Sequence, residues 1–96
     1  MLKIIEELDY KIDKRKNKDN PTFTTLELEL DFVRLLSGVY NMEFVDKLDR
    51  SRLLDILSLC IHNLNNTIVL SGYIKSIKYL LSLELDNNDT KKWLNE

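Results

Sequence analysis

The sequence predicts an all-α fold: one domain over residues 1–96, built as a small antiparallel bundle of four main helices with one or two short ones. The chain has only two glycines and one proline, fewer turn residues than an all-β domain of this size needs. Its hydrophobic content of 44% beside 31% charged residues is typical of a globular domain. Apolar residues recur every three or four positions along most of its length, which is the helical period.

The first predicted helix covers residues 2–16. Its apolar side chains share one face, which makes the helix amphipathic; they are Ile4, Ile5, Leu8 and Ile12. The pattern stops after Ile12, and Pro21 disfavours helical backbone at Asn20. We therefore expect a polar connection between this helix and the next.

The segment TTLELELDF, residues 24–32, fits two templates. Its three leucines alternate with two glutamates, which is the period of a strand. Phe32 and Val33 then break the alternation, whereas Leu26, Leu30 and Val33 also fit a helix. Because Thr24 and Glu27 have the spacing of a helix-capping box, we expect a helix that starts at Thr24. Two ends remain open for it, at Ser37–Gly38 or at Tyr40–Asn41.

This second helix is apolar around most of its circumference. A narrow polar stripe follows one side and consists of Glu27, Asp31, Arg34 and Gly38. The remaining arc spans roughly 220°, so the helix is expected to lie centrally in the core or to face a partner. We assign Leu26, Leu30 and Val33 to the core side. The other flank of the arc is our candidate partner-binding surface, with Leu28, Phe32, Leu35 and Val39.

Glu29 falls inside the apolar arc and joins the candidate partner-binding residues. A buried carboxylate needs a cation or hydrogen-bond donors. Three interpretations remain open at this point. The first turn can protrude into water, where a carboxylate also favours the helix dipole; alternatively, Glu29 can form a polar contact inside the molecule or an ion pair at an interface.

In the second half of the chain the apolar spacing predicts a short helix over residues 42–48 and two long helices over 50–64 and 68–85. Asp49 is the expected N-cap of the first long helix. Gly72 inside the second long helix suggests a close helix crossing. A final short turn, capped by Asp89, is expected to fold Trp93 back onto the bundle. The apolar residues expected to define these elements are Phe44, Val45 and Leu48; Leu53, Leu54, Ile56, Leu57, Cys60, Ile61 and Leu64; and Val69, Leu70, Tyr73, Ile74, Ile77, Leu80, Leu81 and Leu85.

Few residues suit catalysis. Cys60 and His62, the single cysteine and histidine, point to different faces of their helix, Cys60 toward the core and His62 toward water. No metal-ligand spacing and no glycine-rich phosphate loop occurs. We therefore expect a protein that is not an enzyme and has no cofactor, metal or small-molecule substrate.

A basic cluster lies in the last turns of the first helix and just beyond its end: Lys11, Lys14, Arg15, Lys16 and Lys18. It can be a solvated helix end, or it can contact an acidic protein or the phosphates of a nucleic acid. The formal net charge of −2 and a pI of about 5.4 disfavour nucleic acid as the partner.

A single cysteine allows no internal disulfide and favours the reducing cytoplasm. No apolar run approaches the roughly 20 residues of a membrane span, and we expect no signal peptide and no membrane partner. The asparagine- and lysine-rich composition suggests a phage or bacterial source. The sequence thus predicts a non-enzymatic protein–protein interaction module, an inhibitor, adaptor or immunity-type protein that covers a partner or forms a homodimer. A nucleic-acid-associated regulator using residues 11–18 is the alternative.

Overall fold

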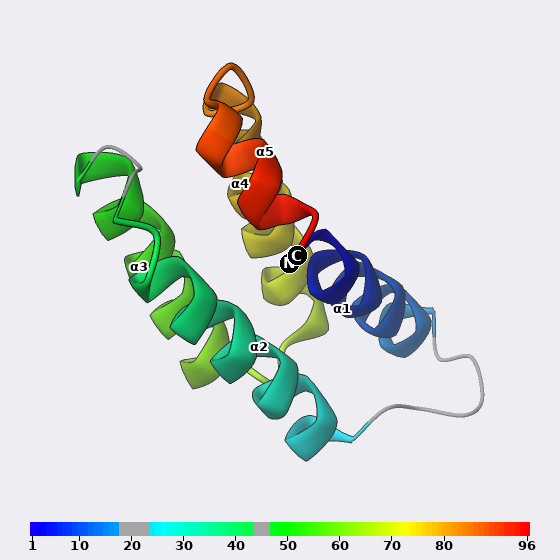
Figure 1. The fold of residues 1–96 in the computed structure, drawn as a ribbon. Coiled ribbons are helices and arrows are strands. Elements are labelled where there is room, and N and C mark those ends of the chain that lie inside the picture. The colour runs from blue at the N-terminus through cyan, green and yellow to red at the C-terminus, as the bar shows by residue number, and fades with distance from the viewer. Residues whose placement is uncertain (18–23, 44–46) are drawn as a thin grey trace.

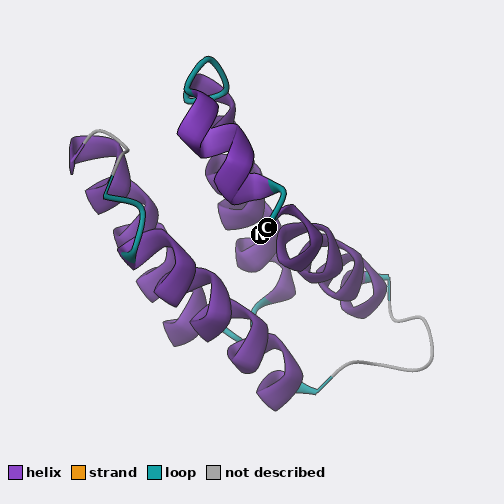
Figure 2. Cartoon of the chain, viewed as in Figure 1, coloured by secondary structure: helices purple, strands orange, loops and turns teal. Residues whose placement is uncertain are grey.

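The computed structural model describes residues 1–17, 24–43 and 47–96, and over these residues it contains helices and no strand (Figures 1 and 2). The predicted all-α class is confirmed. The helices are α1 (Leu2–Lys16), α2 (Thr25–Tyr40), α3 (Lys47–His62), α4 (Thr67–Leu83) and α5 (Asn88–Leu94).

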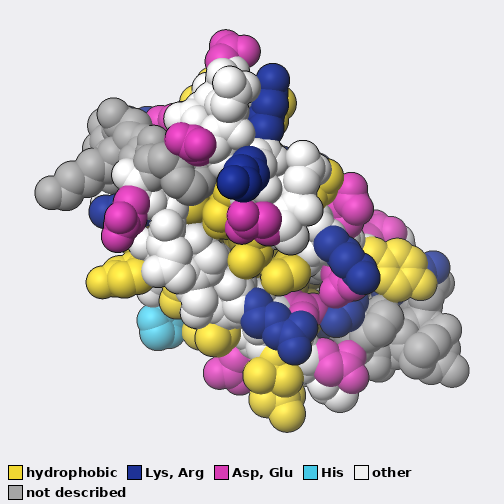
Figure 3. Space-filling view, in the orientation of Figure 1, with side chains coloured by type: hydrophobic (Ala, Val, Ile, Leu, Met, Phe, Trp, Pro, Cys, Tyr) yellow, Lys and Arg dark blue, Asp and Glu magenta, His cyan; other side chains and the backbone are white. Residues whose placement is uncertain are grey.

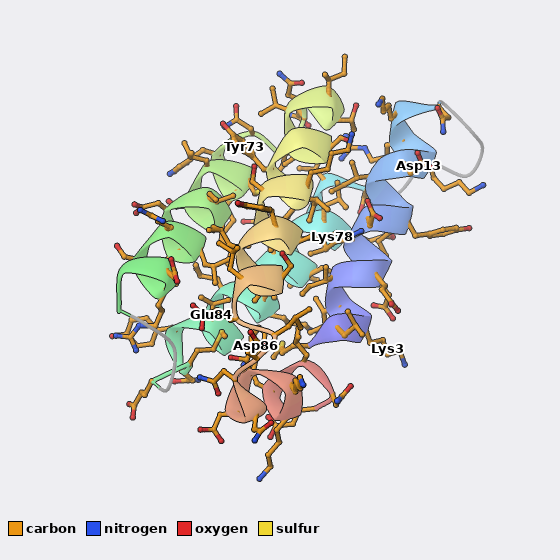
Figure 4. The ribbon with its side chains drawn as sticks, turned by 90° about the horizontal axis from the view of Figure 1, so that it is seen from above. Lys3, Asp13, Tyr73, Lys78, Glu84 and Asp86 are labelled. Carbon is orange, nitrogen blue, oxygen red and sulfur yellow. The ribbon has the colours of Figure 1, made fainter. Side chains whose placement is uncertain are left out.

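The four long helices surround one core. α2 packs against α1 and α3, and α4 packs against the same two helices from the other side. Figure 1 shows α2 and α3 side by side, and Figure 4 shows α4 between α3 and α1. The short α5 lies over the start of α1, where the Met1 backbone nitrogen donates to the Leu94 carbonyl at 3.3 Å. The molecule measures 39 × 22 × 19 Å.

Every long helix contributes an apolar stripe to this core. The fully buried side chains are spaced three and four apart, as on amphipathic helices. The largest of them are Ile5, Leu8, Ile12, Leu28, Phe32, Leu35, Met42, Leu53, Leu57, Leu70, Ile74 and Ile77.

Side chains cap three of the helices. The Thr24 hydroxyl accepts from the Glu27 backbone N–H at 3.1 Å, as its spacing predicts. Asn66 caps α4, and Asn87 caps α5 in place of the predicted Asp89, which lies in the first turn of that helix. Asparagine is among the strongest N-cap residues because its short amide reaches the orphan N–H groups.

Of the short helix predicted over residues 42–48, residues 44–46 are not described, residues 42 and 43 are not helical, and residues 47 and 48 begin α3. α3 begins at Lys47, so Asp49 lies in its first turn and is not the residue before it.

The two glycines differ in their surroundings. A Cβ added at Gly72 would meet nothing within 4 Å, so the predicted close helix crossing at this position is wrong. The close approach occurs instead at Gly38, where an added Cβ would lie 2.6 Å from Met1 Cε and 3.4 Å from Trp93 Cζ2. Trp93 is buried and donates its indole N–H to the Gly38 carbonyl at 3.1 Å, so its predicted return onto the helices is confirmed.

Among the described residues, α1 forms ion pairs with both α2 and α4. Lys11 Nζ lies 2.6 Å from Asp31 on α2, whose side chain is only 7% exposed. Lys78 on α4 points toward α1 (Figure 4) and lies 2.6 Å from Asp9, with both side chains about half in water. The two pairs have the same N–O distance but differ in how far their side chains are buried. Burial determines how much stability is lost when one member of an ion pair is removed.

Replacing Lys11 with alanine is expected to lower the free energy of unfolding by about 1–3 kcal/mol, because the Asp31 carboxylate remains buried without its partner. Lys78→Ala is the matched control and should cost less than about 1 kcal/mol, as exposed pairs do. Urea unfolding followed by circular dichroism measures both. Equal losses would contradict the distinction.

Gly72→Ala is expected to raise the free energy of unfolding by about 0.5–1 kcal/mol, since the added methyl group enters open space and alanine favours helix. Thermal unfolding against the parent chain measures the change. A loss of stability would mean that α4 has a close neighbour at this position.

Candidate functional site

One face of α2 carries apolar side chains that the core does not cover. Leu26 is 63% exposed, Leu30 53%, Val33 42% and Tyr40 69%. Ser37, also exposed, occupies the remaining position on this face. We call these five residues the α2 stripe.

The α2 stripe has the spacing of a coiled-coil seam. Successive members are separated by four, three, four and three positions, which is the heptad rhythm that lets two helices pack along their length. The stripe lies opposite the buried residues Leu28, Phe32 and Leu35, which is as far from the core as a side chain on this helix can be. Figure 3 shows apolar side chains set among charged ones on the face toward the viewer.

The prediction that one flank of α2 is exposed for binding a partner is wrong, because that flank faces the core. Leu28, Phe32, Leu35 and Val39 are completely buried within the single chain, where they form much of the contribution of α2 to the core. The residues assigned to the core, Leu26, Leu30 and Val33, are the exposed ones. The physical reason is that two members of the polar stripe are buried: Asp31 packs against Lys11 of α1, and Gly38 packs against Trp93 of α5. Glu27 and Arg34, the other two members, remain exposed.

Charged residues border the α2 stripe. Glu27 and Arg34 are exposed and lie on its α1 side, seven positions apart. Glu29 borders the opposite edge and is half-buried. Within the described part of the chain none of these three side chains forms an ion pair, so the interface ion pair considered for Glu29 stays a hypothesis.

The basic cluster is largely engaged inside the molecule. Lys11 binds Asp31, Arg15 donates to the Leu64 carbonyl at 3.0 Å, and Lys14 Nζ lies 5.5 Å from the centre of the Tyr10 ring. Lys16 is exposed, and Lys18 lies outside the described residues. A phosphate-binding surface needs several cations free to face one ligand, and three of these five already have intramolecular contacts.

Cys60 is buried in the core, and burial raises the pKa of its thiol to about 12. Its thiolate is therefore scarce at neutral pH, which makes the thiol a poor nucleophile. His62 is exposed at the end of α3. No described group of three or more histidine, cysteine or acidic side chains could hold a metal ion.

A shallow groove of about 560 Å³ lies between α3 and α4. It is lined by Arg52, Asp55, Ile56, Lys75, Ser76, Tyr79 and Leu80. The Ser76 hydroxyl donates to the Gly72 carbonyl at 3.3 Å, and the groove combines opposite charges on an open surface. Among the described helices none is both long and apolar enough to cross a bilayer.

Comparison with protein-family models, curated proteins and solved structures finds no match to this chain.

At pH 8, alkylation of Cys60 in the folded chain is expected to be roughly a hundredfold or more slower than in the urea-unfolded chain, because burial removes both access and thiolate. Mass spectrometry of timed samples measures both rates. Similar rates would mean that this part of the core opens readily.

Burial of Cys60 also gives stability a pH dependence. Its pKa is about 12 in the folded chain against 9.0 for the ordinary thiol. Below pH 9 the thiol is protonated in both the folded and the unfolded chain, so its full contribution to the free energy of unfolding is present. Above pH 9 the unfolded chain loses this proton first, and the free energy of unfolding falls. We therefore expect the Cys60→Ser variant to lack a fall in unfolding free energy that the parent shows as pH rises from 9 toward 12.

Proposed function

We propose that the chain is a non-enzymatic protein–protein interaction module, an inhibitor, adaptor or immunity-type protein, that binds through the α2 stripe. The observation that supports this function is the apolar heptad spacing of Leu26, Leu30, Val33 and Tyr40 on the exposed side of a helix whose other side is fully packed. Such a seam can be buried only against another molecule. Helices commonly bind partners in this way, by packing an apolar row of side chains against them.

Burying the exposed apolar side chains of the α2 stripe would contribute enough free energy to support a specific contact. Each of the four large side chains is about half exposed, so covering each contributes about 1 kcal/mol. Scattered single apolar residues on a surface are ordinary, whereas several of them aligned on one face of one helix indicate an interaction site. The polar rim supplied by Glu27, Glu29 and Arg34 is typical of such sites.

We further propose that successive long helices run antiparallel as a bundle and that the protein acts in the cytoplasm. Contacts between α1 and α2, α2 and α3, and α3 and α4 support the first proposal. The single reduced cysteine in the core supports the second.

Affinity capture from the producing cells tests the function with two matched baits. Leu30→Asp places a charge in the α2 stripe, and Leu83→Asp places the same charge on α4 at a leucine that is equally exposed, 54% against 53%. We expect proteins held by the parent chain, including untagged copies of itself, to be lost with Leu30→Asp and kept with Leu83→Asp. The same proteins retained by all three baits would contradict the proposal. Circular dichroism checks that both variants fold.

A further inference from the structure

We propose that the α2 stripe binds a second copy of this chain, with the two α2 helices antiparallel across a twofold axis. This inference rests on the proposed function and names the occupant of its surface. The alignment sets Leu30 of each copy against Val33 of the other and Leu26 against Ser37. Leucine therefore meets a smaller side chain in each layer, which lets the two helices approach closely.

Charge complementarity at the edge of the α2 stripe argues for a second copy. In an antiparallel pair, residues on one edge of the seam meet residues on the same edge of the other helix. Glu27 and Arg34 share an edge, are both exposed and have no ion-pair partner in the described chain. In the proposed alignment Glu27 of one copy lies beside Arg34 of the other, and the twofold axis repeats the pair.

The same charges disfavour other alignments. Sliding one helix by a heptad keeps the stripe in contact through Leu30 and Tyr40, but brings Arg34 beside its own copy. A parallel pair would match Arg34 with Glu29, which is half-buried in its own chain, and would align the two helix dipoles unfavourably. The antiparallel alignment uses two fully exposed charges and opposes the dipoles.

Sedimentation of the full chain at micromolar concentrations and low salt tests the pairing. We expect a dimer that Arg34→Glu weakens by about tenfold, since two attractive ion pairs become two repulsive ones. The double variant Arg34→Glu/Glu27→Arg should restore it, because the charges are exchanged within the same pair. Arg34→Glu/Glu29→Arg is the matched control and should not restore it. The three positions involved all lie on α2, where Glu27 and Arg34 are exposed and Glu29 is half-buried, and thermal unfolding checks that each variant folds.

Restoration by the Glu29 variant and not by the Glu27 variant would overturn the antiparallel alignment. A parent chain that stays monomeric would overturn self-pairing itself, and a dimer whose stability none of these variants changes would overturn pairing through the α2 stripe. If the parent is monomeric and yet captures another protein in a manner that Leu30→Asp abolishes and Leu83→Asp does not, the proposed function stands and only the second copy is excluded. Failure of both experiments removes the function as well.

Discussion

The contact between Lys11 and Asp31 fixes which way α2 faces. A carboxylate that is almost completely withdrawn from water requires a cation beside it, and the cation comes from α1 at 2.6 Å. Once the polar side of α2 is turned toward α1, the remaining arc divides in two. Leu28 and Phe32 enter the core, and Leu30 and Val33 are left facing outward. The candidate interaction surface is therefore a consequence of one ion pair on the other side of the helix.

At Gly38, nearer the C-terminal end of α2, close packing and not an ion pair holds the helix in place. Gly38 has no side chain, and Met1 and Trp93 occupy the space that one would fill. The indole hydrogen bond to the Gly38 carbonyl adds a directional contact between residues 55 positions apart. α2 is thus held at Asp31 by charge and at Gly38 by shape, so its rotation about its own axis is defined at two points two turns apart.

Much of the fold was predictable from local patterns. The bounds of α1, the capping of α2 by Thr24 and the buried residues Leu53, Leu57, Ile74 and Ile77 all follow from helical spacing and N-cap chemistry. These elements have one clear apolar face, so the spacing also determines their orientation. α2 has an apolar arc too wide for that, and its orientation depends on Lys11, which is 20 residues away along the chain. Local spacing cannot reveal such a pairing. The sequence shows the alternating spacing of four and three positions among the residues of the α2 stripe. It does not show whether this stripe faces the core or water.

Ser37 interrupts the apolar face between Val33 and Tyr40. A leucine in its place would join the exposed residues into one unbroken hydrophobic ridge, and large ridges of that kind drive proteins out of solution. With a hydroxyl there, water can wet the middle of the helix whenever no companion is present. If two copies pair through the α2 stripe as proposed, this hydroxyl reduces the apolar surface that each separated copy exposes to water.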